Sequence, residues 1–194
     1  MIALTFDDGP NEPYTRQILD VLGEYGAKAT FFVIGKWARK CSDGLLVTVQ
    51  GSGHLIGNHT DSHPPLDSVS DADASIELRK CQATIEYFCW AKPDVYFRPP
   101  FGKHSEYTEK QCREWGWKSV LWDIHGGDWA ADSVEAITEP IFAYLDAHKS
   151  GIVLLHDGYY KEFGADRSKT VEATRRILER YKGEKFVTIG EYMQ

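Results

Sequence analysis

The sequence predicts an α/β fold in which a parallel sheet curls into an open or closed βα barrel. Seven short apolar runs alternate with segments of helical periodicity, which is the pattern of βαβ units. No Pro/Ser-rich linker or low-complexity tract divides the 194 residues, so we expect a single domain spanning 1–194. Polar clusters directly follow five of the runs, and in βα barrels the functional residues lie where strands end and loops begin.

The predicted strands are runs of four to six residues, several of them rich in β-branched or aromatic side chains. They are Ile2–Phe6, Ala29–Ile34, His54–Gly57, Val95–Arg98, Ser119–Trp122, Gly151–Leu155 and Phe186–Ile189. The apolar residues of Gly151–Leu155 are continuous rather than alternating, which is typical of a parallel strand buried on both faces.

Helices are predicted between these strands from apolar spacing and from terminal residues. They are Glu12–Tyr25, Gly35–Lys40, Asp71–Trp90, Glu106–Trp115, a helix that Ser133 caps and that extends through Ala147, and Ser168–Tyr181. Gly26 ends the first of them. The segment Asp43–Gln50 stays open: its apolar run fits a strand, whereas the aspartate cap and the glycines that follow fit a helix.

Composition excludes several classes of protein. Lys and Arg number 22 against 29 Asp and Glu, a formal net charge of −7. An acidic chain without a basic run is not expected to bind nucleic acid, and no apolar stretch approaches the roughly 20 residues that span a bilayer. The N-terminus lacks the features of a signal peptide, so we expect either a cytosolic protein or one whose leader was removed. The four cysteines form no C-x-x-C pair and are expected mostly as buried free thiols.

Two polar clusters contain side chains that bind metals. Asp7 and Asp8 follow the first strand, where the alternative is a cap for the next helix. His59 and His63 are four residues apart, so on one face of a helical turn both can bind one divalent cation. The alternative is two surface histidines in a loop. Two histidines and one carboxylate form an open zinc site, and Asp8 can supply that carboxylate.

Three further clusters add groups for acid, base and oxyanion chemistry. Arg98 follows a strand and can pair with a carboxylate in a fork geometry. Phe101 has the first backbone N–H after two prolines, which suits an oxyanion, although the segment also fits a plain turn. The loop Trp122–Trp129 by itself fits packed tryptophans. His156 ends a buried strand, where it can act as a general acid or base. Taken together, the five clusters indicate metal-assisted hydrolysis.

The same clusters, in this order, resemble the motifs of the polysaccharide deacetylases of carbohydrate esterase family 4, the NodB-homology domain. The matching segments are Thr5–Pro10 (T-F-D-D-G-P), His59–His63 (H-[ST]-x-x-H), Arg98–Gly102 (R-P-P-[YF]-G), Asp128–Trp129 (D-W) and Leu154–His156 (L-x-H). The resemblance covers nearly the whole chain. It implies a distorted (β/α)₇ barrel and a hydrolase that removes acetyl groups from N-acetylglucosamine-containing glycans such as chitin or peptidoglycan.

The resemblance also implies roles for individual residues. Asp7 is similar to the catalytic base, which Arg98 holds ionised, and His156 is similar to the general acid, which Asp128 orients. The implied ligands of one divalent ion, expected to be zinc with cobalt or nickel as substitutes, are Asp8, His59 and His63. The implied substrate-binding residues are Phe101 through its N–H, and Trp129 and Leu154 around the acetyl methyl group.

Some positions depart from the family pattern. Phe101 replaces the commoner tyrosine, and Asp61 stands where members often have a larger residue. His125 stands where many have aspartate, so it is either a tolerated change or a group that contacts substrate or a second ion. The loop Tyr159–Asp166 fits either a sugar cleft or a solvated loop.

The alternatives to an N-deacetylase are an acetylxylan esterase of the same family, a small-molecule deacylase and a non-catalytic carbohydrate-binding module. The expected partner is an acetylated glycan, and the expected state is a monomer. Family members usually act outside the cell or at its envelope, which is the location we expect if a leader was removed.

Overall fold

The computed structural model describes residues 1–41, 44–89 and 94–194, and its centre is a seven-stranded parallel sheet. The strands are β1 (Ile2–Asp7), β2 (Ala29–Val33), β3 (Leu55–Asn58), β4 (Tyr96–Phe97), β5 (Lys118–Ser119), β6 (Ile124–His125) and β7 (Gly151–His156). Their order is β5-β4-β3-β2-β1-β7-β6, so the sheet is curled with β5 and β6 as its edges in the described residues. The predicted α/β fold, a distorted (β/α)₇ barrel, is confirmed.

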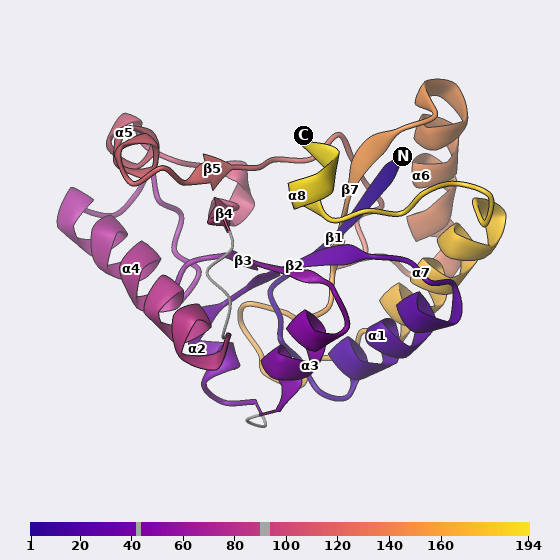
Figure 1. Cartoon of the computed structure of the whole chain (residues 1–194), viewed down its shortest axis with the longest axis horizontal. Helices are drawn as coiled ribbons and strands as arrows, with labels where there is room; N and C mark the ends of the chain where they lie inside the picture. Colours follow the sequence, from indigo (N-terminus) through magenta and orange to yellow (C-terminus); the bar gives the residue numbers. More distant parts are fainter. Residues whose placement is uncertain (42–43, 90–93) are drawn as a thin grey trace.

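The larger helices lie on the outer side of this sheet, whereas the short helix α8 (Ile189–Tyr192) packs on its inner side. The helices are α1 (Tyr14–Glu24), α2 (Gly35–Ala38), α3 (Leu45–Gly51), α4 (Asp71–Phe88), α5 (Glu106–Glu114), α6 (Val134–His148), α7 (Ser168–Arg180) and α8, with a 3₁₀ turn, η1, at Pro100–Gly102. In Figure 1 the larger helices form an arc from α4 through α1 to α6, while both chain termini lie on the opposite side.

Sequence signals place most of the helix ends correctly. Ser70, Ser105 and Ser133 each accept a backbone hydrogen bond as the N-cap of α4, α5 and α6. The segment that fitted either a strand or a helix is α3. Asp43 was predicted as the first residue of that segment, and Trp90 as the last residue of the helix before the fourth strand. Both residues lie outside the described ranges.

One predicted strand is absent from the described part of the chain, one strand was not predicted, and one is displaced. Phe186–Ile189 forms only an isolated bridge, between Phe186 and Ile2, in the described residues. The segment then turns into α8, because the Thr188 side chain caps that helix by accepting from the N–H of Glu191. The true seventh strand is β6, which was predicted as loop. It is short, and it pairs with β7 at the far edge of the sheet. The predicted strand Ser119–Trp122 is also displaced, since β5 is Lys118–Ser119.

Alternation along β1 decides what faces the inside of the curl. Ile2, Leu4 and Phe6 pack in the large core between the sheet and the outer helices, where the Phe6 and Phe31 rings stack at 5.1 Å. Successive strand residues point to opposite faces, so Thr5 and Asp7 face the inside. There a smaller core that includes Ile189 of α8 closes the amino-terminal end of the strands. The inner face therefore remains available to polar groups at the carboxyl-terminal end.

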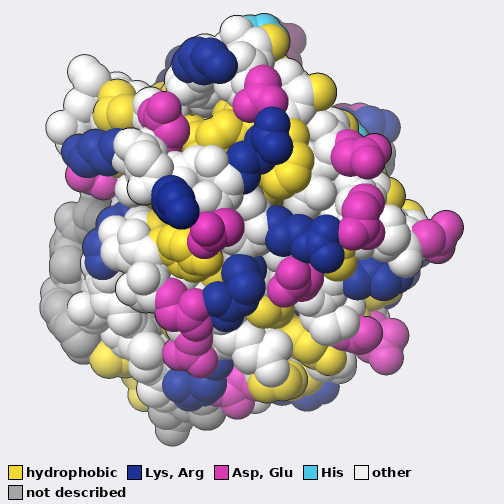
Figure 2. Space-filling view, turned by 90° about the vertical axis from the view of Figure 1, so that its right-hand side faces the viewer, with side chains coloured by type: hydrophobic (Ala, Val, Ile, Leu, Met, Phe, Trp, Pro, Cys, Tyr) yellow, Lys and Arg dark blue, Asp and Glu magenta, His cyan; other side chains and the backbone are white. Residues whose placement is uncertain are grey.

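The outer surface over α1, α6 and α7 carries mixed charges. In Figure 2 the basic and acidic side chains on this side alternate without forming a large patch of one sign. Arg180 pairs with Asp146 of α6 at 2.7 Å. Arg175 pairs with Glu24 of α1. Pairs of this exposed kind contribute little to stability, about 0–1 kcal/mol each.

Neither a long apolar helix nor a disulfide is present in the described residues. No helix there has the length and hydropathy needed to cross a membrane. The four cysteines are all buried and free, as the sequence predicts. Burial raises the pKa of Cys41, Cys81 and Cys112 to about 12 and that of Cys89 to about 11, so these thiols are not reactive nucleophiles.

Candidate active site

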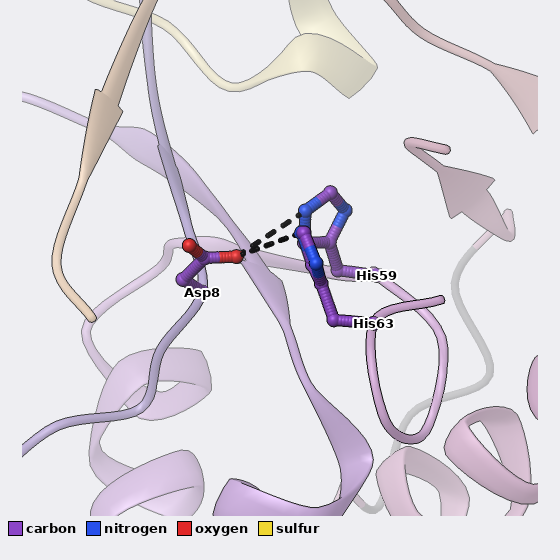
Figure 3. Close-up of side chains that lie close together, drawn as sticks. All are labelled: Asp8, His59 and His63. Carbon is purple, nitrogen blue, oxygen red and sulfur yellow. Dashed lines mark ion pairs between the residues drawn. The ribbon is translucent and has the colours of Figure 1, made fainter. Parts of the chain in front are cut away.

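Three buried side chains from two strand ends converge on one point. Asp8 directly follows β1, and His59 and His63 lie in the loop after β3. The Oδ1 atom of Asp8 is 3.2 Å from Nε2 of His63 and 3.5 Å from Nε2 of His59. Figure 3 shows both imidazoles turned toward this carboxylate. One ligand atom from each residue lies within 4.8 Å of the other two.

The two histidines meet through a turn rather than through a helix, which corrects the expectation from their spacing. Thr60 and His63 have φ values of 66° and 70°, and Asp8 has a φ of 70°. The N–H of Thr60 donates to Oδ1 of Asn58, and the N–H of His63 donates to Oγ1 of Thr60. Left-handed conformations of non-glycine residues persist only where the surroundings enforce them, and they concentrate at functional sites.

The chemistry of this set fits a divalent cation. His59 donates from Nδ1 to the carbonyl oxygen of Arg98 at 2.7 Å, which leaves its Nε2 as the free ligand atom. Burial lowers the pKa of His59 to about 4, so the ring is neutral. Burial alone would raise the pKa of Asp8, but the neighbouring histidines, His63 first, hold it well below its usual range. The buried Asp8 Oδ1 has no hydrogen-bond partner in the described chain, so a bridging cation would satisfy it.

Arg98 holds the second carboxylate of the site, Asp7. The guanidinium is fully buried, and its Nη1 donates to Oδ1 of Asp7 at 2.8 Å and to Oγ1 of Thr5 at 2.7 Å. Nε and Nη2 donate to the carbonyl oxygens of Val120 and Leu121. The predicted pairing is present, but the fork geometry is not, because the other donors serve the loop after β5. Oδ2 of Asp7 therefore remains free and lies 3.7 Å from Nε2 of His59.

His156 ends β7 and forms a dyad with Asp128. It is the register partner of Asp7 on the neighbouring strand. Its Nδ1 donates to Oδ1 of Asp128 at 2.8 Å, and its backbone N–H donates to Oδ2 at 2.7 Å. Thr170 also donates to Oδ2. Burial alone would lower the pKa of His156, but the charge and hydrogen bond of Asp128 raise it to about 9. The imidazole is therefore protonated at neutral pH, with its Nε2–H left over.

These groups surround one cavity of about 360 Å³. The residues that line it are Asp7, Asp8, His59, His63, Pro99, Phe101, Trp122, Trp129, Leu154, His156, Tyr159 and Tyr160. All the predicted site residues line it except Arg98 and Asp128, which support lining residues from behind. Phe101 and Trp129 are 49% and 46% exposed, so they form its open edge.

Four aromatic and proline residues of the wall were not assigned from the sequence. The most notable is Tyr160, whose ring stacks on that of His63 at 4.4 Å and meets Phe101 edge-on. The loop Tyr159–Asp166 was open between a cleft and a solvated loop, and its first two residues line the cavity. Phe163 instead packs on Trp37 at 5.4 Å. The sequence signal for this part of the wall was the pair Tyr159 and Tyr160, which follows closely after His156.

His125 packs against the exposed edge of the site. Its ring centroid is 5.1 Å from that of Trp129, whose ring in turn meets His156 edge-on at 5.2 Å. In the structure, the contact of His125 with the site is thus the packing of its ring on Trp129.

Comparison with known proteins agrees with this arrangement. The family model for polysaccharide deacetylase matches residues 1–120. The chain belongs to the polysaccharide deacetylase family. Along its whole length it is 39% identical to a peptidoglycan-N-acetylglucosamine deacetylase of Bacillus cereus, and it covers 88% of that relative. Over 91% of its length it is 32% identical to a chitooligosaccharide deacetylase of Sinorhizobium fredii, 83% of which it covers.

Solved structures of polysaccharide deacetylases have the same fold. The whole chain superimposes on 89% of the peptidoglycan deacetylase PdaC from Bacillus subtilis with a TM-score of 0.84 and 29% identity. The resemblance to carbohydrate esterase family 4 that the motifs indicated is thereby confirmed.

Proposed function

We propose that this protein removes acetyl groups from N-acetylglucosamine residues of a glycan by metal-assisted hydrolysis of the amide. The observation that carries the proposal is the shared cavity, in which a buried Asp8–His59–His63 cluster lies beside an Arg98-held carboxylate and a protonated histidine. The names of two relatives, a peptidoglycan-N-acetylglucosamine deacetylase and a chitooligosaccharide deacetylase, support this class of substrate.

In this proposal Asp8, His59 and His63 hold one divalent ion, and zinc is the ion we propose. Two neutral imidazoles and one carboxylate are the protein ligands of many open zinc sites. A divalent ion bound there would supply Lewis acidity for polarising the acetyl carbonyl and for lowering the pKa of a water molecule to roughly 7.

Asp7 is proposed as the general base. Its Oδ2 is free of hydrogen bonds to Arg98 and faces the same cavity as the proposed ligands, so it can accept the proton of the attacking water. Arg98 donates to the other oxygen, Oδ1, which orients the carboxylate.

His156 is proposed as the general acid. The carbon–nitrogen bond of an amide does not break readily unless the nitrogen is protonated as it leaves. The raised pKa of His156 keeps a proton available on Nε2 for the sugar nitrogen. Asp128 fixes the ring through Nδ1 and stabilises its charge. Because Asp7 and His156 are partners in the β1–β7 register, the base and the acid lie side by side on the cavity wall.

The remaining predicted residues are proposed to bind the substrate. Phe101 follows two prolines without N–H groups and has a left-handed φ of 59°, so its own N–H is proposed to donate to the oxyanion. Leu154 and Trp129 line the cavity next to His156 and are proposed to contact the acetyl methyl group.

The test is acetate release from chitin oligosaccharides, peptidoglycan fragments and acetylxylan. We expect release from an N-acetylglucosamine substrate, and a loss on the order of 100-fold or more in the Asp7→Asn variant. The matched control is Asp146→Asn on the surface of α6, which should retain full activity. Full activity of folded Asp7→Asn would refute the proposed base. Release from acetylxylan alone would favour the esterase alternative, and sugar binding without release would favour a binding module.

A further inference from the structure

A buried charge cluster lies directly behind the proposed metal ligands. The segment His59–His63, called the metal loop here, contains Asp61, whose side chain is only 4% exposed. Asp61 is not among the residues that line the cavity. It stands where family members often have a larger residue, so the motif itself gives it no role.

Two cations from two helices hold this carboxylate. Nη1 of Arg39, at the end of α2, lies 2.6 Å from Oδ1 of Asp61, and Nη2 donates to Oδ2 at 3.0 Å. Lys80 of α4 donates to Oδ2 at 2.7 Å. Nη1 of Arg39 also donates to Oγ1 of Thr84 on α4.

The backbone of the metal loop is also hydrogen-bonded to α2. The N–H of Gly35 donates to the carbonyl of Thr60 at 3.0 Å, and that of Lys36 donates to the carbonyl of Asp61 at 2.9 Å. A Cβ on Gly35 would lie 2.5 Å from Oδ1 of Asp61, so a glycine is required for this approach. The side chain and the backbone of Asp61 thus both contact the segment 35–39 that forms and ends α2.

We propose that Asp61 is a positioning residue: its ion pairs with Arg39 and Lys80 hold the metal loop so that His59 and His63 converge on Asp8. The loop needs such support because Thr60 and His63, on either side of Asp61, both have left-handed backbones that the surroundings must enforce. Exposed ion pairs rarely fix a loop conformation, but here the anion is buried and is bound by two cations from different helices. The inference rests on the metal site of the proposed function.

The test compares Asp61→Asn with the wild type by cobalt(II) titration of chelator-stripped protein. We expect the dissociation constant for cobalt to rise about tenfold or more. We also expect a changed visible absorption spectrum of the bound ion, which a merely structural role would not produce. The matched control is Arg175→Gln, which breaks an arginine–carboxylate pair between α1 and α7 and should leave affinity and spectrum unchanged.

Further variants separate the possible failures. If Asp61→Asn does not fold, Arg39→Gln and Lys80→Gln remove the same pairs from the partly exposed side and should weaken cobalt binding in the same direction. Wild-type affinity and spectrum in a variant that only lowers the melting temperature would overturn the positioning role. A His63→Ala variant that binds cobalt as tightly as the wild type would instead overturn the metal site itself, and this inference with it.

Discussion

Replacing Asp128 with asparagine changes the charge beside His156 while keeping the size of the side chain. The asparagine oxygen can still accept the hydrogen bond from Nδ1 of His156, but its NH₂ group then stands in place of Oδ2, so the bonds that Oδ2 accepts from the backbone N–H of His156 and from Thr170 are lost. The negative charge disappears as well. This charge and its hydrogen bond are the main causes that raise the pKa of His156 to about 9 against the opposing effect of burial, with further contributions from Asp8 and Asp7. We therefore expect the pKa of His156 in Asp128→Asn to fall toward its ordinary value of 6.5.

The size of the effect follows from the two pKa values. The difference between 6.5 and about 9 corresponds to about 3 kcal/mol of preference for the protonated ring. At pH 7.5 a group with a pKa of 9 is about 97% protonated, and one with a pKa of 6.5 is about 9% protonated. A full fall to 6.5 in Asp128→Asn would thus lower the activity at pH 7.5 about tenfold through protonation alone.

The assay is the pH dependence of kcat/KM for acetate release. In the wild type the basic limb of the profile should fall near pH 9, and in Asp128→Asn it should move toward pH 6.5. A basic limb at the same pH in both proteins would refute the assignment of His156 as the acid.

Stability of the metal-stripped protein gives an independent reading of the same pKa shift. The folded-state pKa of His156 is raised, so its contribution to the free energy of unfolding is complete below pH 6.5 and is lost as the pH rises through about 9. Asp128→Asn should remove this decline. A pH-independent difference between the two proteins in urea unfolding would contradict the shift.

Two other substitutions test the supports of the site. Arg98→Met leaves Asp7 buried without its cation and should cost roughly 3–5 kcal/mol in urea unfolding, so a loss below about 1 kcal/mol would contradict the role of this pair. Gly158→Ala places a Cβ 2.1 Å from the carbonyl oxygen of Asp8, so the β1 end must shift and cobalt affinity should fall about tenfold or more. Gly183→Ala, whose Cβ meets nothing within 4 Å, is the control, and equal cobalt affinity in the two alanine variants would show that this packing does not matter.

Much of the site was predictable because strand ends carry strong local signals. The strands β1 and β7 can be recognised from their largely apolar runs. Because they are parallel neighbours in the sheet, the polar residues at their carboxyl-terminal ends lie side by side. Asp7 and His156 are therefore brought together by topology alone. The spacing of His59 and His63 correctly indicated that the two side chains lie together. It suggested a helical turn, however, whereas the chain forms a turn in which Thr60 and His63 have left-handed backbone conformations.

The errors in the strands have a common physical cause. Ile124–His125 lies among glycine, aspartate and tryptophan and has little intrinsic strand character, so only pairing with β7 makes it a strand. Conversely, Phe186–Ile189 has strand-like residues, but Thr188 caps a helix and stops the pairing. Tertiary contacts decided both cases.

Contacts between distant loops could not be read from the sequence. Tyr160 stacks on His63, although about a hundred positions separate them, because β3 and β7 end at the same edge of the curled sheet. The pairing of Asp61 with Arg39 and Lys80 depends likewise on how α2 and α4 pack beside the metal loop. Neither pairing leaves a periodic or motif-like trace.

The most direct test of the proposed function is acetate release before and after removal of the metal. Protein stripped with a chelator would be assayed on chitin oligosaccharides and peptidoglycan fragments, and then again after zinc is restored. We predict no release from the stripped protein and recovery on adding zinc, with no recovery in His63→Ala. Undiminished release without metal, or no release from either substrate by protein that has bound zinc, would contradict the account.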